Sequence, residues 1–514
     1  MPETWAVIRS KTQQDRACRT GHPIRQTFMA CSIILGKPGG QPSPRSLNKA
    51  LPTEPSKFHT PDNRPVANTS QSIPKTIPKA QGLPVLGSVT FDSPLWLVDR
   101  YHELGPVFRM SILQHRMIVL AGPEANLLMR EEGDTLFTSK DTWKNVLEAF
   151  GSDNPFMLAW DGPDHATLRA GLKVGYAGST LYPQMPKLMD SLVRLMMRWP
   201  RHQAMSVTPL VKRLVSLLLA YMAINQEPDE VMDDLIFLFR TVIKIHLTRT
   251  RPGFVKYMPQ YLKSRRNVLA MGQRIWNEHL MHDMAEEGGN FIDHVRRFQA
   301  EHPDLMTEND AIATIQTPFL AGMDTAASSL SFLLYHILRD STLREMVVAE
   351  ADQLFADGVP TRASLRRMRQ TRWIAMESLR MHPIALTLPR TSTRDFEFQG
   401  HHIPAGARCL IAISVTHHLP EFFPEPKRFD IERYAPPRME HTQTHAYVPY
   451  GIGSHACLGA STADLLFLIV TAALFHHLEI EMSPPDHVLN VIRNPLSCPD
   501  DSFRMVVTGE RQRA

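Results

Sequence analysis

The chain has 514 residues, of which 43% are hydrophobic and 21% are charged, and its formal net charge is +4. This composition is typical of a globular protein, and the small net charge argues against a nucleic-acid partner. The five cysteines are widely scattered and form no CxxC pair, which argues against a disulfide framework and a structural zinc site. No stretch reaches the ~20 apolar residues that a membrane span requires.

Residues 1–76 are rich in proline and basic residues and poor in acids. The simplest interpretation is a disordered leader, or a start codon placed upstream of the one used. A mitochondrial transit peptide is the alternative, although abundant prolines fit an amphipathic helix poorly. We therefore expect a cytoplasmic protein, with mitochondria as the alternative location, and a folded domain over residues 77–514.

The folded domain begins with two short predicted strands, at residues 107–110 and 117–121. From about residue 123 helical periodicity dominates, with predicted helices at 162–174, 188–199, 210–224, 229–248 and 261–287. The longest predicted helix starts at Thr307-Glu308-Asn309-Asp310, a capping-box pattern, and runs through Arg339. Two more helices follow at 341–355 and 363–381, then short strands at 396–398 and 408–413 and a proline-rich coil. These patterns predict one mainly helical domain with a minor β region.

Residues 450–459, Tyr-Gly-Ile-Gly-Ser-His-Ala-Cys-Leu-Gly, form a glycine-rich loop that carries a single cysteine, Cys457. We call it the cysteine loop, and an apolar helix is predicted directly after Cys457, over about residues 458–476. The positive N-terminal end of that helix favours a thiolate, a soft ligand that suits iron in a haem context. Taken alone, a cysteine of this kind is more often a buried small hydrophobic residue.

The second pattern lies inside the long predicted helix, at Ala321-Gly322-Met323-Asp324-Thr325. Glycine in a helix interior costs ~1 kcal/mol relative to alanine, and close packing of a flat or bulky group is its usual reason. Asp324 is costly in this apolar run unless it has a task, and Thr325 can bond the carbonyl one turn back. The alternative is a core helix that is kinked at Pro318.

The third pattern is Glu377-x-x-Arg380, which places both side chains on one face of the predicted helix at 363–381. Alone this pattern is weak, because such pairs are common on exposed helices. Arg433 in the proline-rich coil offers a second guanidinium. A carboxylate that binds both arginines would fix this coil by charge-assisted hydrogen bonds.

Together these patterns, in this order and at these distances, resemble the cytochrome P-450 family. The segment Gln81-Gly82-Leu83-Pro84-Val85-Leu86-Gly87 is also similar to that family, and the resemblance covers about residues 77–510. It implies the cytochrome P-450 fold, a single large helical domain that is mainly α with small antiparallel sheets, over residues 77–514.

The resemblance implies a haem b cofactor (iron-protoporphyrin IX) with Cys457 as the axial ligand of its iron. Gly453 and Gly459 match the family glycines that let the backbone approach the porphyrin. The residues matched to the haem propionates are His165, Arg169, Arg390 and His455. For His165 the alternative is a surface histidine, but its spacing of one helical turn from Arg169 favours the binding role.

The resemblance also assigns Asp324 and Thr325 to the acid–alcohol pair that positions water and delivers protons during dioxygen activation. Glu377, Arg380 and Arg433 match a structural triad on the cysteine side of the haem. One position departs from the family pattern: Tyr450 stands where the family usually has phenylalanine. Its hydroxyl requires a hydrogen-bond partner.

The implied activity is that of a haem-thiolate monooxygenase, expected as a monomer, that inserts one oxygen atom of dioxygen into a lipophilic small molecule. The predicted roof of the site is mainly apolar, which favours such a substrate, and comprises segments 150–158, 319–321, 384–388 and 494–496. Two alternatives stay open: a peroxide-using or isomerising haem-thiolate enzyme, and a non-catalytic haem-binding protein. The intact Asp324–Thr325 pair favours the monooxygenase.

Electrons are expected from a separate ferredoxin, flavodoxin or reductase. The predicted docking surface is an arginine cluster just before Glu377, formed by Arg366, Arg367, Arg369 and Arg372. An acidic partner would complement this charge, although a solvated run of charges is the alternative interpretation.

Overall fold

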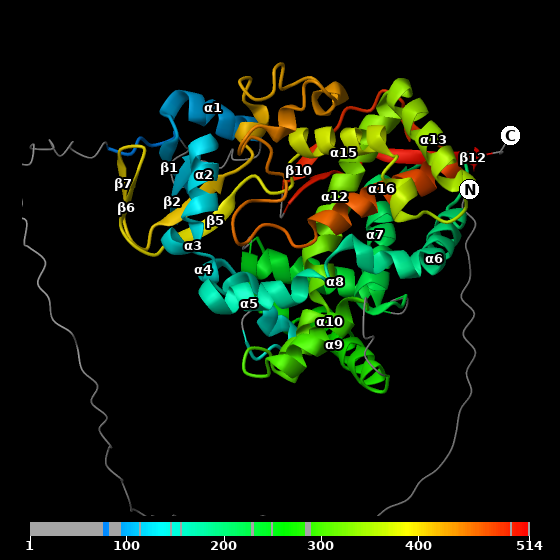
Figure 1. Cartoon of the computed structure of the whole chain (residues 1–514), viewed down its shortest axis with the longest axis horizontal. Helices are drawn as coiled ribbons and strands as arrows, with labels where there is room; N and C mark the ends of the chain where they lie inside the picture. Colours follow the sequence, from blue (N-terminus) through cyan, green and yellow to red (C-terminus); the bar gives the residue numbers. More distant parts are fainter. Residues whose placement is uncertain are drawn as a thin grey trace, which may run out of the picture. The chain divides into compact units, whose positions relative to one another are not determined.

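The computed structural model describes residues 76–81, 94–112, 115–143, 146–154, 157–227, 231–247, 250–282, 289–493 and 496–511 (Figure 1). The predicted leader, apart from residue 76, lies outside these ranges. Its disorder therefore stays a prediction, as does the domain boundary at residue 77.

Helices dominate the described residues, as the periodicity predicts. The α-helices are α1 (Pro94–Leu104), α2 (Pro123–Glu131), α3 (Gly133–Leu136), α4 (Lys140–Trp143), α5 (Gly162–Lys173), α6 (Met185–Met197), α7 (Val207–Ile224), α8 (Met232–Val242), α9 (Pro259–Leu280), α10 (Phe291–Glu301), α11 (Glu308–Thr314), α12 (Thr317–Arg339), α13 (Ser341–Ala356), α14 (Arg362–Leu365), α15 (Arg369–Met381) and α16 (Ala460–His477). Short 3-10 helices include η1 (Leu147–Phe150), η2 (Met157–Ala159) and η7 (Ile431–Tyr434).

The long helix predicted from Thr307 to Arg339 is divided into α11 and α12, so the prediction of one continuous helix is wrong. Its start is confirmed, because the Thr307 hydroxyl accepts from the Asp310 N–H at 3.2 Å and the Asp310 carboxylate accepts from the Thr307 N–H at 2.9 Å. The break lies just before Pro318, which occupies the first turn of α12. A proline there removes no helical hydrogen bond, so the chain accommodates it by starting a new helix rather than by kinking an old one.

The largest sheet has five strands in the order β1-β2-β8-β5-β3. Its strands are β1 (Val107–Ile112), β2 (His115–Ala121), β3 (Phe137–Thr138), β5 (Leu388–Ser392) and β8 (Arg408–Ala412). All neighbours in this sheet are antiparallel except β2 and β8, which run parallel with Leu120 opposite Ile411. The predicted small antiparallel sheets are confirmed, and the one parallel pair beside them is made possible by the long connection between β2 and β8.

The remaining strands form smaller antiparallel sheets. They are β4 (Met205–Ser206), β6 (Phe396–Phe398), β7 (His401–Ile403), β9 (Leu478–Ser483), β10 (Val491–Arg493), β11 (Ser497–Pro499) and β12 (Arg504–Glu510). Figure 1 shows the five-stranded sheet beside α1 and α2, while most of the helices gather on the opposite side.

The core is organised around α12, which packs against α7, α15 and α16. Two of these helices, α7 and α16, have the length and apolar composition of a membrane span, but 78% and 72% of the tested windows are buried inside the protein. Buried helices of globular proteins share these properties, so this finding is weak evidence for a span. The expectation of no membrane span stays a prediction.

Candidate functional site

The cysteine loop is folded into a tight turn that presents Cys457. Gly451 and Gly453 have φ values of 75° and 81°, which favour glycine. A Cβ atom on Gly453 would also lie 2.7 Å from the Met129 carbonyl oxygen, so no other residue fits at this position. The Cys457 N–H donates to the Tyr450 carbonyl at 2.9 Å and closes the turn. Helix α16 begins three residues later.

Cys457 is exposed to solvent. Burial raises the pKa of this thiol, while a hydrogen bond from the Gly459 backbone and the charge of Arg169 counteract the rise. Helix α16 starts at Ala460, three residues after Cys457, and the expected contribution of its N-terminus to the thiolate stays a prediction. Coordination to a metal cation would supply the missing stabilisation of the thiolate.

Helix α5 brings His165 and Arg169 against the cysteine loop. Arg169 donates from Nη2 to the carbonyl oxygen of Ala456, directly before Cys457. The rings of His165 and His455 stack with centroids 4.1 Å apart. His455 in turn lies 3.1 Å from the Asp161 carboxylate through its Nε2 atom. The prediction that His165 and Arg169 share one site with the cysteine loop agrees with this arrangement.

Several donors of this group lack an anionic partner among the described residues. The Nε2 atom of His165 and the Nδ1 atom of His455 are buried without a hydrogen-bond partner there. Burial, followed by the charges of His455 and Arg169, lowers the pKa of His165 to about 4, so its ring is neutral near pH 7. Arg390 is buried as well, and burial lowers its pKa although Asp161 and Asp134 act in the opposite direction.

Thr325 and Asp324 are neighbours on α12, but their side chains contact different partners. The Thr325 hydroxyl donates to the Ala321 carbonyl at 2.7 Å, which is the local contact that the sequence predicts. Asp324 forms an ion pair with Lys212 of α7, and Arg240 of α8 lies 3.9 Å from its carboxylate. No sequence pattern indicates Lys212, because the two residues of this pair are far apart in the chain.

The packing of α12 against α7 explains why position 322 is a glycine, and the sequence alone did not indicate this contact. A Cβ atom at this position would lie 3.2 Å from the side chain of Leu219 on α7. The close approach of α7 and α12 therefore favours a small residue here. This is a second explanation beside the flat ligand that the sequence suggests.

Replacing Lys212 by methionine is expected to lower the free energy of unfolding by about 2 kcal/mol, because Asp324 then stays partly buried and keeps only the longer contact with Arg240 at 3.9 Å. The two side chains are 9% and 18% exposed, which is why the pair should contribute measurably. Equilibrium urea unfolding would measure the loss. The matched control is Arg213→Met on the same helix, whose partner Asp233 is 82% exposed and which should cost less than about 1 kcal/mol. Equal losses of unfolding free energy in both variants would contradict a stabilising role for the Lys212–Asp324 ion pair.

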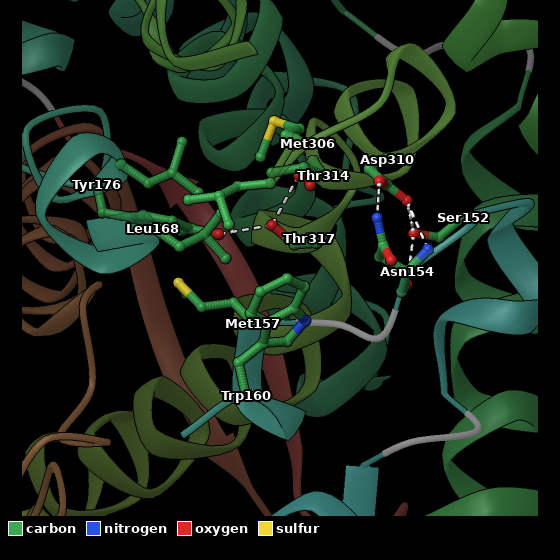
Figure 2. Close-up of a pocket in the computed structure, with 12 residues that line it drawn as sticks. Ser152, Asn154, Met157, Trp160, Leu168, Tyr176, Met306, Asp310, Thr314 and Thr317 are labelled. Carbon is green, nitrogen blue, oxygen red and sulfur yellow. Dashed lines mark hydrogen bonds between the residues drawn. The ribbon is translucent and has the colours of Figure 1, made fainter. Parts of the chain in front are cut away.

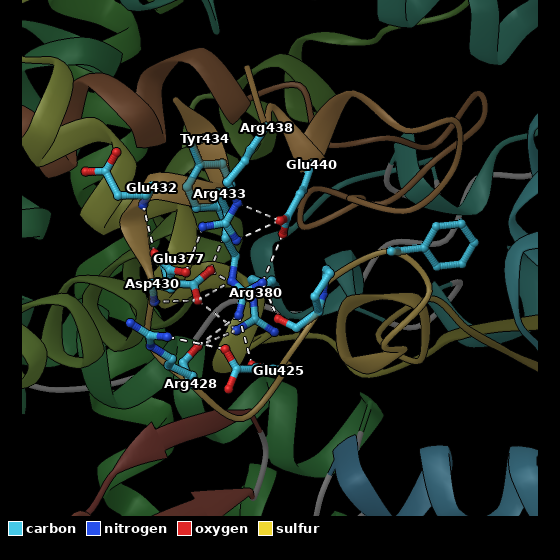
Figure 3. Close-up of polar contacts among 12 residues, drawn as sticks. Glu377, Arg380, Glu425, Arg428, Asp430, Glu432, Arg433, Tyr434, Arg438 and Glu440 are labelled. Atoms are coloured by element: carbon cyan, nitrogen blue, oxygen red, sulfur yellow. Dashed lines mark hydrogen bonds and ion pairs between the residues drawn. The ribbon is translucent and has the colours of Figure 1, made fainter. Parts of the chain in front are cut away.

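Glu377 of α15 holds a fully buried network of charges (Figure 3). Its carboxylate lies 2.7 Å from Nε and 2.8 Å from Nη2 of Arg380, so this contact is bidentate. Arg433 of η7 donates from Nε to the same carboxylate at 3.3 Å. The predicted contact of one carboxylate with two arginines is therefore present, and it joins the proline-rich coil to α15.

The network extends beyond the residues that the sequence indicates. The Tyr434 hydroxyl donates to Glu377 at 2.9 Å, and Arg433 lies 3.0 Å from the Glu440 carboxylate. Arg438 connects Glu440 with Asp430 through ion pairs of 2.7 and 2.9 Å. The many charged residues between 425 and 440 are the sequence feature that could have indicated these contacts.

Tyr450 finds its partner on α16. Its hydroxyl donates to the Asp464 carboxylate at 2.5 Å. Burial raises the pKa of Asp464, and the Tyr450 hydrogen bond and the charge of Arg372 lower it in part. Both residues line a cavity of about 190 Å³ together with Arg372 and Tyr447.

The predicted roof segment at 150–158 is anchored to the start of α11 (Figure 2). The Asp310 carboxylate accepts hydrogen bonds from Ser152 Oγ at 2.7 Å and from the backbone and side-chain nitrogens of Asn154 at 2.8 Å. Beside these contacts, Met157 and Thr317 line a cavity of about 20 Å³, which has room for about one water molecule. This small cavity is not large enough for a substrate. Residues 155–156 and 494–495 of the predicted roof lie outside the described residues.

A family model described as cytochrome P-450 matches residues 78–506. The chain belongs to the cytochrome P-450 family. A solved structure of cyanobacterial CYP120A1 with bound retinoic acid has a TM-score of 0.72 at 22% identity, and the match covers 85% of this chain and 100% of that chain. At this identity the likeness shows the fold alone, and it confirms the predicted cytochrome P-450 fold.

Two relatives carry named activities. Cyclooctat-9-en-7-ol 5-monooxygenase of Streptomyces melanosporofaciens is 33% identical over 179 residues, which make up 34% of this chain and only 38% of that protein. Taxane 10-beta-hydroxylase of Taxus cuspidata is 24% identical over 420 residues, 77% of this chain and 81% of that protein. The first match is therefore partial and the second nearly full-length.

Family membership implies a haem cofactor, and the site suits one. Cys457 is exposed next to a backbone turn that only glycine permits at position 453. Arg169, Arg390 and the unpaired Nε2 of His165 are donors that carboxylates such as the haem propionates would satisfy. Gly459 shows no comparable constraint, because a Cβ atom there would meet only the Cys457 sulfur at 3.9 Å. Its cofactor role stays a prediction.

Proposed function

We propose that this protein is a haem-thiolate monooxygenase that inserts one oxygen atom of dioxygen into a lipophilic small molecule. The observation that carries the proposal is the exposed Cys457 on a glycine-constrained loop, next to the buried Nε2 atom of His165, which has no hydrogen-bond partner in the part of the chain that the structure describes. The family match and the named monooxygenase and hydroxylase relatives support the same activity.

Bound haem would supply the redox chemistry of dioxygen activation. The chain would contribute the sulfur of Cys457 as an iron ligand, while Arg169, Arg390 and His165 would bind the propionates. The Thr325 hydroxyl donates a hydrogen bond to the Ala321 carbonyl oxygen. The lone pairs of the hydroxyl oxygen can therefore accept a hydrogen bond from water. Asp324 would deliver protons after loosening its ion pair with Lys212.

We propose a hydrocarbon-rich substrate. The rings of Phe150 and Phe239 have centroids 5.0 Å apart, and those of Phe239 and Phe319 are 6.5 Å apart, so aromatic side chains link the predicted roof to α12. Aromatic residues at the predicted roof would favour apolar ligands. The names of the two relatives refer to cyclooctat-9-en-7-ol and a taxane, and the solved structure holds retinoic acid.

The deciding experiment compares two ways of driving turnover. Purified protein is first titrated with terpenoid and polyene compounds, and binding is followed as displacement of iron-bound water in the Soret band. Ligands that bind are then tested with dioxygen plus a reductase system, and separately with peroxide alone. Turnover that requires dioxygen and reductant supports the monooxygenase. Turnover with peroxide alone supports the peroxide-using alternative, and binding without turnover in either arm supports a non-catalytic haem protein.

We further propose that an acidic ferredoxin, flavodoxin or reductase docks on the arginine cluster. Arg366, Arg367 and Arg369 are exposed, and only Arg367 has an exposed acid nearby, Asp357 at 3.3 Å, among the ion pairs of the described chain. Arg372 is half-buried and faces the cavity next to Tyr450. Within the cluster, Arg372 is therefore the residue that lies close to the cysteine loop.

Reversing two charges, Arg366→Glu with Arg369→Glu, is expected to reduce reductase-driven turnover about tenfold or more at low salt, because electrostatic steering of the partner is lost. Substrate binding and the haem spectrum should stay unchanged. The control is Arg116→Glu with Arg504→Glu, which changes the net charge equally at exposed positions on β2 and β12. Unchanged turnover of the cluster variant at low salt would remove this docking site.

We also propose a monomer in the cytoplasm, with mitochondria as the alternative. The basic, proline-rich composition of residues 1–76 underlies both options. A fluorescent reporter fused behind residues 1–76 distinguishes them, since import would collect it in mitochondria and a plain leader would leave it diffuse. Sedimentation of the purified chain tests the monomer.

A further inference from the structure

Helices α15 and α16 pack against each other (Figure 1), and a cavity of about 190 Å³ lies between them beside the start of the cysteine loop. Its apolar wall is formed by Ala375 and Leu379 of α15 and by Phe467 and Leu468 of α16, and all four side chains are buried. A cavity of about 150 Å³ with aliphatic and aromatic walls holds one benzene molecule. This cavity therefore has room for one six-membered ring.

Two charged side chains of the cavity wall keep open hydrogen-bonding positions. The Oδ1 atom of Asp464 accepts the Tyr450 hydroxyl at 2.5 Å, while its Oδ2 atom has no hydrogen-bond partner in the described chain. The Arg372 guanidinium has no ion-pair or hydrogen-bond partner there either, yet it lies near enough to lower the pKa of the Asp464 carboxyl. Tyr447 is already satisfied, because its hydroxyl donates to the Met376 carbonyl at 2.9 Å.

A single hydroxyl group would satisfy both charged side chains at once. It can donate to the open Asp464 oxygen and accept from the Arg372 guanidinium. A carboxylate ligand would face the like charge of Asp464, and an ammonium ligand would face that of Arg372, so the pair favours a neutral ligand.

We propose that this cavity is a ligand site for a neutral molecule with one six-membered ring and one hydroxyl group, the chemistry of a monocyclic phenol. The ring would pack against the apolar wall, and the hydroxyl would lie between Asp464 and Arg372. The site goes beyond the proposed monooxygenase activity. None of the described residues that are matched to the haem or to the predicted roof lines this cavity.

Isothermal titration calorimetry of the purified holoprotein with phenol tests the site. One phenol molecule should bind with a Kd on the order of 1 mM or below. Ala375→Phe fills the cavity from α15 and should abolish this binding. Phenol that binds above the haem would keep its affinity in this variant, so the variant identifies the site.

Arg372→Met keeps the test usable if Ala375→Phe fails to fold. It should weaken phenol binding about tenfold or more, because the hydroxyl loses a charged donor. Binding of toluene, which has the same ring without the hydroxyl, should not weaken. The matched control is Arg369→Met on the same helix, since Arg369 is exposed and does not line the cavity.

No heat change up to about 10 mM phenol would overturn the inference, and the cavity would then hold only water. Equal phenol affinities in the wild type and the Arg372→Met variant would overturn it as well. Neither result depends on a haem spectrum, so failure of this site is distinguishable from failure of the proposed function.

Discussion

Replacing Cys457 by alanine is expected to abolish reductase-driven turnover by at least about 10³-fold, equivalent to ~4 kcal/mol of barrier. Cys457 is the one cysteine of the described chain in the glycine-constrained loop, and its thiolate would donate electron density to the iron. The reduced carbon-monoxide complex should also lose the red shift of its Soret band that a thiolate ligand causes. Absorbance spectra of the purified protein check this directly.

Cys498→Ala is the matched control for this change. Cys498 lies on β11, is half-buried and has no place in the cysteine loop, so its replacement should leave the spectrum unchanged. Should Cys457→Ala keep a thiolate spectrum while Cys498→Ala loses it, the ligand assignment would be wrong. If the wild-type protein and both variants fail to bind haem, Cys457 is a packing residue, as a lone cysteine often is.

Glu377→Gln is expected to destabilise the fold by about 3–5 kcal/mol, because two buried guanidiniums lose the negative charge between them. The side chains of Glu377, Arg380 and Arg433 are all 0% exposed, so water cannot solvate the guanidiniums after the carboxylate charge is lost. The proline-rich coil should detach from α15 first, since Arg433 joins it to this carboxylate. Urea unfolding followed by circular dichroism measures the change.

Tyr434→Phe keeps the test usable if Glu377→Gln fails to fold. It removes only one hydrogen bond to the Glu377 carboxylate and should cost about 1.5–3 kcal/mol, since bonds to charged groups are stronger than neutral ones. The control is Glu425→Gln, whose ion pair with Arg428 is 73% and 65% exposed and should contribute less than about 1 kcal/mol. A loss at Tyr434 no larger than at Glu425 would contradict a supporting role for the network.

Local patterns predicted the parts of the site that depend on neighbours in sequence. The Thr307 capping box, the Thr325 bond to its own helix and the Glu377–Arg380 pair each arise within one helical turn, so spacing alone indicates them. The glycine-rich turn around Cys457 follows from positive φ values that few other residues adopt. Arg433 was predicted because its chemistry matches a carboxylate that needs a second partner.

Contacts between distant segments escaped prediction. The Asp324–Lys212 pair, the packing of Leu219 over Gly322 and the Tyr450–Asp464 bond depend on how whole helices dock, which no local pattern specifies. The break between α11 and α12 was missed because the capping box and the apolar run were interpreted as one helix, although Pro318 fits equally well at the start of a second one.

The parallel pairing of β2 with β8 has a consequence for synthesis on the ribosome. Ile118 pairs with Cys409 and Ala121 with Ala412, so the centre of the five-stranded sheet joins segments almost three hundred residues apart. At ~5–20 residues per second, β2 emerges tens of seconds before its partner exists. During that interval the β1–β2 hairpin exposes an unpaired strand edge, which is prone to association with other chains. Folding of this protein in cells should therefore depend on chaperones that shield the hairpin until residue 412 is made.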